Sequence, residues 1–178
     1  MWFTAEATGT VSALFDPAEV DLLRHAVTQL ADLLAAADTD PFQASADPVV
    51  LRLLPDAYID DPEAAAEFRR FTAGSLLDRK VRNARALLET LGDEPPGDTV
   101  EATGVATDAA RGVAIELDAQ AVQAWLRTLT DLRLTVAERL EISPDGVQHL
   151  EGEEAGFLRD VYEWFGMVQE SLVHAIDA

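Results

Sequence analysis

The strongest constraint on the fold is the recurrence of apolar residues at helical spacing in four long segments. The segments span residues 17–37, 62–91, 119–140 and 154–175, and each gathers its apolar residues on one side of a helix. Such helices cannot bury their apolar sides singly, so they must pack together. At 178 residues the chain suits one domain. The sequence therefore predicts a mainly α fold, a four-long-helix bundle, as a single domain over 1–178.

Short segments of period-two alternation predict a small sheet at one end of this bundle. Residues 2–7 and 10–15 alternate around Thr8-Gly9, which is typical of a hairpin. Residues 113–117 alternate in the same way, and we expect them to complete a three-stranded antiparallel β-sheet. A short helix is expected to begin at Pro48 and to end before Pro55.

Acidic residues before prolines or before apolar runs predict where the long helices begin. Asp16, Asp61 and Asp118 each stand where a side chain can cap a helix N-terminus. In the segment 62–91 the apolar stripe predicts a buried side built on Leu77 and its helical neighbours. Phe68 and Phe71 are expected to extend that buried side over the first half of the helix.

The charge and the missing cysteines narrow the functional classes. The net charge of −20 opposes the approach of a phosphate backbone, so direct nucleic-acid binding is disfavoured and a protein partner with a basic surface is favoured. Solubility alone would also explain the charge. With no cysteine, thiolate metal sites, disulfides and thiol redox chemistry are excluded within this chain. We expect a cytoplasmic protein without a membrane span.

No stretch carries a complete catalytic or cofactor-binding motif, so we expect no enzyme activity, no cofactor and no metal. Asp56, Asp60 and Asp61 could hold a hard cation, but capping of the helix that follows is the stronger interpretation. His149 lies near three glutamates without the spacing of a zinc motif, and a solvated loop is favoured there.

Two groups of charged residues are candidates for an interaction site. Arg79, Lys80, Arg82 and Arg85 form a candidate anion or partner face, although a solvated helix side is the favoured interpretation. Arg133 falls near the apolar stripe of its helix, so it needs an acceptor, and Asp131 is too close in sequence to face it. We predict that Arg133 binds the acidic segment 56–61, with a ligand-binding arginine as the alternative.

Three segments resemble the DUF2017 family of actinobacterial proteins. They are LRLLPDAYIDDPEAAAEFRR at 51–70, AWLRTLTDLRLTVAERLEI at 124–142 and YEWFGMVQESLV at 162–173, which also make Tyr58, Tyr162 and Trp164 candidate interaction residues. The resemblance implies a protein of unknown function whose relatives are described as transcriptional regulators. The resemblance also implies relatives that sense oxidation through cysteines, but this chain departs from that pattern because it contains no cysteine.

Two functions remain open on these grounds. The first is a non-enzymatic regulatory or adaptor protein whose basic partner could be a sigma factor or a polymerase region, with a homodimer also open. The second is a small-molecule-binding helical domain with a pocket near Arg133, Tyr58 and Trp125; a cryptic hydrolase ranks below both. Exposed apolar residues on a helix would favour the first function, and a closed pocket with convergent polar groups the second.

Overall fold

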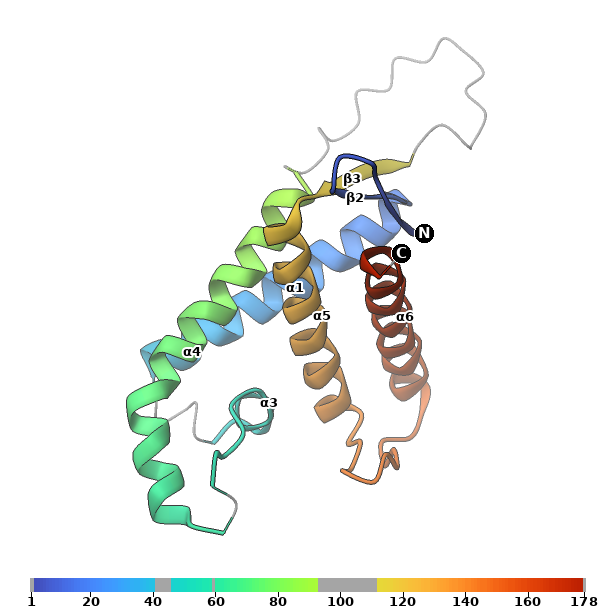
Figure 1. The fold of residues 1–178 in the computed structure, drawn as a ribbon. Helices are drawn as coiled ribbons and strands as arrows, with labels where there is room; N and C mark the ends of the chain where they lie inside the picture. Colours follow the sequence, from blue (N-terminus) through green and yellow to red (C-terminus); the bar gives the residue numbers. More distant parts are fainter. Residues whose placement is uncertain (1, 41–45, 59, 93–111, 178) are drawn as a thin grey trace.

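The computed structural model describes residues 2–40, 46–58, 60–92 and 112–177, which form helices and one small sheet (Figure 1). This confirms the predicted mainly α fold with a three-stranded antiparallel sheet. In chain order the elements are β1 (Phe3–Ala5), β2 (Val11–Phe15), α1 (Pro17–Thr39), α3 (Pro48–Leu53), α4 (Pro62–Thr90), β3 (Val113–Leu117), α5 (Ala119–Arg139) and α6 (Glu153–Ile176).

The sheet has the strand order β1-β2-β3, and both pairs are antiparallel. Gly9, with φ of 83°, allows the turn between β1 and β2. The apolar side of the sheet packs on α5, where the rings of Phe3 and Phe15 lie 5.6 and 5.8 Å from that of Trp125. The Phe3 amide also donates to Ser171 Oγ of α6 at 2.8 Å, which holds the sheet on the helices.

The long helices α1, α4 and α5 begin where the acidic residues predict, whereas α6 follows Gly152 without a side-chain cap. Asp16 and Glu19 form a capping box at α1, because the Asp16 side chain accepts from the Ala18 amide while Glu19 accepts from the Asp16 amide. Asp61 Oδ1 accepts from the Ala64 amide at 3.0 Å, and Asp118 caps α5 in the same way. These side chains satisfy amide groups that have no partner inside the helix.

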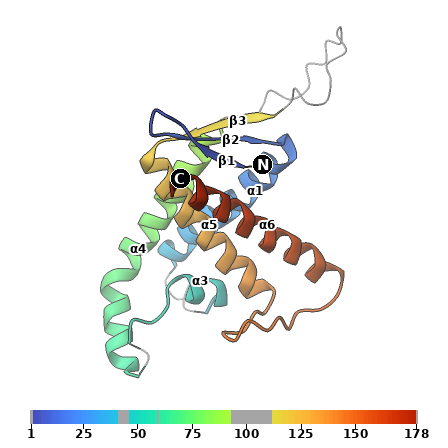
Figure 2. The ribbon, with the colours of Figure 1, turned by 45° about the vertical axis from the view of Figure 1, so that its right-hand side comes forward.

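The helices pack in a chain of pairs, α1 against α4, α4 against α5, and α5 against α6 (Figure 2). Fully buried side chains from every pair meet in one core, including Leu23, Leu87, Trp125 and Phe165. Among the described residues, no helix is both long and apolar enough to cross a membrane.

The first turns of α4 extend beyond the rest of the bundle (Figures 1 and 2). Between Pro62 and Leu77 only Ala65 is buried in this helix. The prediction that Phe68 and Phe71 lie in the core is wrong, because their exposed fractions are 43% and 70%. The apolar pattern correctly predicts one side of the helix, but none of the other described helices packs over Phe68 and Phe71 there.

A groove along helix α4

An open groove runs between α4 and α5, beside the joint that connects α3 to α4. Its volume is about 800 Å³. The joint contributes the segment Leu53–Ala57, α5 contributes Leu126, Arg127, Thr130 and Asp131, and α6 contributes Gln169 and Val173. The remaining wall is one side of α4. We call this surface the α4 groove.

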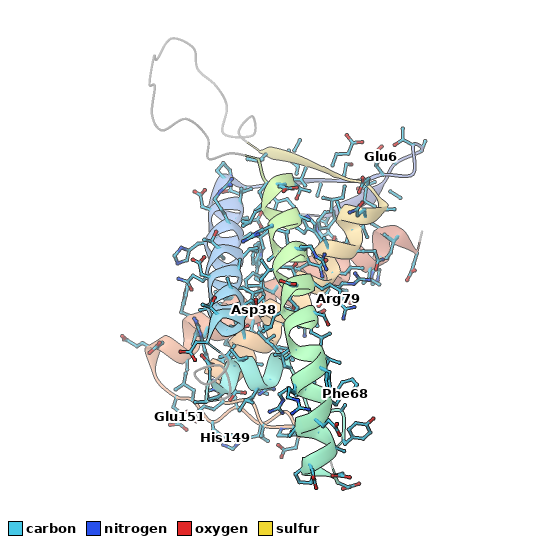
Figure 3. All side chains as sticks on the ribbon, turned by 90° about the vertical axis from the view of Figure 1, so that its left-hand side faces the viewer. Glu6, Asp38, Phe68, Arg79, His149 and Glu151 are labelled. Atoms are coloured by element: carbon cyan, nitrogen blue, oxygen red, sulfur yellow. The ribbon has the colours of Figure 1, made fainter. Side chains whose placement is uncertain are left out.

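The α4 wall follows from helical spacing. Phe68, Thr72, Leu76, Arg79 and Asn83 all line the groove, and at about 100° per residue they fall within roughly 80° of one another around the helix. Figure 3 shows Phe68 and Arg79 on the same side of α4. The wall is therefore continuous from the projecting turns to the middle of the helix.

A buried ion pair joins the two main walls. Lys80 Nζ of α4 donates to Asp131 Oδ1 of α5 at 2.5 Å, and Asp131 is only 4% exposed. Burial raises the pKa of Asp131 above its ordinary value, because the carboxylate loses water, while the hydrogen bond and charge of Lys80 act in the opposite direction. Lys80 thus differs from the solvated position that its sequence suggests, since its side chain is only 20% exposed.

The joint itself is held by two other arginines. Arg69 of α4 forms an ion pair with Asp56, and Arg52 of α3 donates to Glu138 Oε2 of α5 at 2.8 Å. The ring of Tyr58 packs edge-on against Phe68, with centroids 6.0 Å apart. These contacts place the joint at the end of the groove.

The prediction that Arg133 binds the 56–61 segment is wrong. Its guanidinium donates to Gln169 Oε1 at 3.0 Å and to the Tyr162 hydroxyl at 3.4 Å, and it lies 5.1 Å from the centre of the Tyr162 ring. Asp131 and Arg133 are two residues apart, so their side chains point about 160° away from each other around α5. Because α5 lies between α4 and α6, Asp131 faces α4 and Arg133 faces α6.

The other predicted residues lie outside the groove or on its rim. Trp164 Nε1 donates to Glu19 Oε1 at 3.4 Å and so ties α6 to the start of α1. Arg82 and Arg85 are exposed and have no ion pair with the described residues, and the same holds for Arg79 on the rim. Tyr58, Trp125 and Arg133 do not surround one pocket, since Trp125 is fully buried with its Nε1 donating to Thr90.

The acidic candidates for a metal site have other roles. Asp56 pairs with Arg69 and Asp61 caps α4, while His149 and Glu151 lie on the exposed loop between α5 and α6 (Figure 3). Within the described ranges, no three His, Asp or Glu side chains are grouped to hold a metal ion.

Sequence reasoning missed the Lys80–Asp131 pair and the groove residues Arg127 and Gln169. One signal for the pair was present: Thr128, Asp131 and Thr135 recur at helical spacing and are all buried. The Thr135 hydroxyl donates to the Asp131 carbonyl within α5, but a buried carboxylate such as that of Asp131 needs a donor from another element. The pattern does not say which helix supplies this donor, and Lys80 lies 51 residues away.

Comparisons with known proteins give a family match over nearly the whole chain. The family model described as "Domain of unknown function (DUF2017)" matches residues 2–176. Proteins named "Oxidative stress regulator AosR" from Mycobacterium bovis and Mycobacterium tuberculosis are each 32% identical over 147 residues. That alignment covers 74% of this chain and 59% of those relatives, so the chain spans less than two thirds of their length.

A relative from Mycobacterium leprae is 29% identical over 191 residues, which cover 91% of this chain and 80% of that protein. No solved structure matches the chain.

Proposed function

The chain belongs to the DUF2017 family, and from this membership we propose that it is a non-enzymatic regulatory protein that acts through contacts with a protein partner. The Mycobacterium relatives share the word regulator in their names, which supports a regulatory role. The proposed place of action is the cytoplasm.

The observation that carries this proposal is the set of exposed aromatic side chains on the projecting end of α4 and on the joint before it. Phe71 is 70% exposed, Tyr58 49% and Phe68 43%. Aromatic residues and arginine are enriched in the centres of protein interfaces, and here the guanidinium of Arg70 lies 5.0 Å from the centre of the Phe71 ring. A partner that covers these rings would remove apolar surface from water.

The open form of the α4 groove supports the same function. A small molecule is usually held in a pocket that covers most of its surface, whereas this groove is open to solvent. The open groove and the exposed rings therefore favour a protein partner over the small-molecule alternative.

The net charge supports a partner with a basic surface, such as a sigma factor or a polymerase region. At −20 the chain attracts basic proteins over several ångströms and repels nucleic acid. The proposed regulation therefore acts without direct binding of nucleic acid by this chain.

The proposed regulation does not use thiol chemistry within this chain. The Mycobacterium relatives are named for oxidative stress, but these 178 residues contain no cysteine. No sulfenic acid or disulfide can therefore form here. A response to oxidation through these residues would need chemistry other than that of cysteine.

A quantitative pull-down from the cytoplasm of the source organism tests the proposal, with the wild-type chain, Phe71→Ser and Val147→Ser as baits. Val147 is a matched control, because it is apolar and 48% exposed on the loop between α5 and α6. We expect a protein that Phe71→Ser loses, that Val147→Ser keeps, and that high salt weakens. Recovery of the same proteins in equal amounts by all three baits would show that the exposed end of α4 does not bind the partner. Recovery of this chain alone would indicate a homodimer.

A further inference from the structure

We propose that the α4 groove binds an acidic amphipathic helix of a protein partner. The inference rests on the proposed function and specifies the chemistry of the segment that enters the groove.

The charge of the groove is opposite to that of the molecule. Four of the thirteen basic residues line it, namely Arg69, Arg79, Lys80 and Arg127, against two of the thirty-three acidic ones. Both of those acids, Asp56 and Asp131, are already in ion pairs with groove residues. Arg79 and Arg127 remain, exposed and without an ion pair among the described residues. An occupant with carboxylates would meet these two guanidinium groups.

The apolar lining and the length fit a helix. Between the charged side chains lie Leu53, Leu54, Phe68, Leu76 and Leu126. The α4 wall runs from Phe68 to Asn83, which at 1.5 Å per residue is about 22 Å. A helix of about four turns would lay its apolar side along this wall, and its outer side would stay in water because the groove is open.

The net charge of the whole molecule favours a basic partner at long range, whereas the groove favours an acidic segment at contact range. The net charge acts over roughly a Debye length, about 8–10 Å, and attracts a partner whose bulk surface is basic. Inside the groove, hydrogen bonds and contact charges decide which segment fits. The proposed partner is therefore basic overall and inserts an acidic, apolar segment.

A peptide-display selection reads the preferred charge directly. The library consists of helices of about fifteen residues with leucines at one side and random Asp, Glu, Lys or Arg at the flanking positions. Selection on the wild-type chain is expected to enrich Asp and Glu at the flanks. Enrichment of Lys and Arg, or no enrichment over an empty-surface control, would overturn the inference.

Charge-reversal variants then locate the binding site of the enriched peptide, with fluorescence anisotropy as the readout. The groove variant is Arg79→Glu/Arg127→Glu, and the control is Arg82→Glu/Arg85→Glu, which makes the same charge change with Arg82 and Arg85 exposed outside the groove lining. We expect the groove variant to weaken binding about tenfold and the control less than about twofold.

If both double variants weaken peptide binding equally, the attraction is a general electrostatic one and the groove is not the binding site. If the groove variant unfolds, Arg79→Gln/Arg127→Gln provides the same comparison without reversed charges. A pull-down partner that depends on Phe71, together with a failed selection, would leave the regulatory proposal standing and reject only this inference, since Phe71 does not line the groove.

Discussion

Replacing Lys80 by methionine is the most informative single perturbation of the structure. The change keeps an apolar stem of similar length and removes the ammonium group that donates to Asp131. The carboxylate of Asp131 would then remain in the interface between α4 and α5 without its partner, at 4% exposure. Stranding a buried charge in this way costs more than the ion pair contributes when both partners are present.

The expected loss in unfolding free energy is about 3 kcal/mol at pH 7, at the lower end of the range for broken buried pairs. The lower end applies because the Lys80 side chain keeps 20% exposure, so some water can reach the site. The double variant Lys80→Met/Asp131→Leu removes both charges and is expected within about 1 kcal/mol of wild type. Arg79→Met is the matched control, expected within about 0.5 kcal/mol because Arg79 is exposed.

The cost of Lys80→Met should depend on pH. In wild type, burial raises the pKa of Asp131. The contribution of this carboxyl group to the unfolding free energy is therefore fully present below its pKa in the unfolded state, and it is lost as pH rises through its pKa in the folded state. Removing Lys80 removes the interactions that lower this pKa, which raises it further. The destabilisation should therefore be largest at neutral pH and should shrink as pH falls through that raised pKa.

Urea denaturation of the four proteins between pH 4 and pH 8 measures these values. A loss below about 0.5 kcal/mol for Lys80→Met at pH 7 would show that Asp131 is solvated or finds another donor. A loss that does not change with pH would show that the stem of Lys80, and not its charge, stabilises the interface.

Three further predictions test the elements around the groove. Asp61→Ala should cost about 1 kcal/mol in denaturation by removing the cap of α4, whereas the exposed neighbour change Asp60→Ala should cost almost nothing. Arg133→Ala should lower the unfolding free energy by about 1–2 kcal/mol, because the contacts with Gln169 and with the hydroxyl and ring of Tyr162 are lost. Arg133→Lys should restore part of this loss. A loss above about 3 kcal/mol would indicate that the variant leaves a buried acid without its partner. In gel shifts at physiological salt, the isolated chain should show no sub-micromolar binding to duplex DNA.

Local rules predicted the helices and strands well because their causes are local. Asp16, Asp61 and Asp118 satisfy amide groups within three residues along the chain, and this geometry is the same in any fold. The period-two pattern at residues 113–117 is local in the same way, although the pairing of this strand with β2 joins distant parts of the chain.

The site could not be predicted in the same way because its contacts join distant segments. The pattern around Arg133 indicated a partly buried cation, but the identity of its acceptor depends on α6 lying on that side of α5. The pattern around Phe68 and Phe71 indicated an apolar helix side, but not that the other described helices would leave it uncovered. These uncovered rings are the basis of the proposed function.

Site-specific photo-crosslinking in the source cell shows whether a protein partner contacts the projecting end of α4. A photoreactive phenylalanine analogue replaces Phe71 on the projecting end of α4, and the same analogue at Val147 serves as the control, since both side chains are exposed. A discrete protein adduct is expected from position 71 and is expected to be absent from position 147. The same adducts from both positions, or no protein adduct from position 71, would contradict regulation through a partner at this surface.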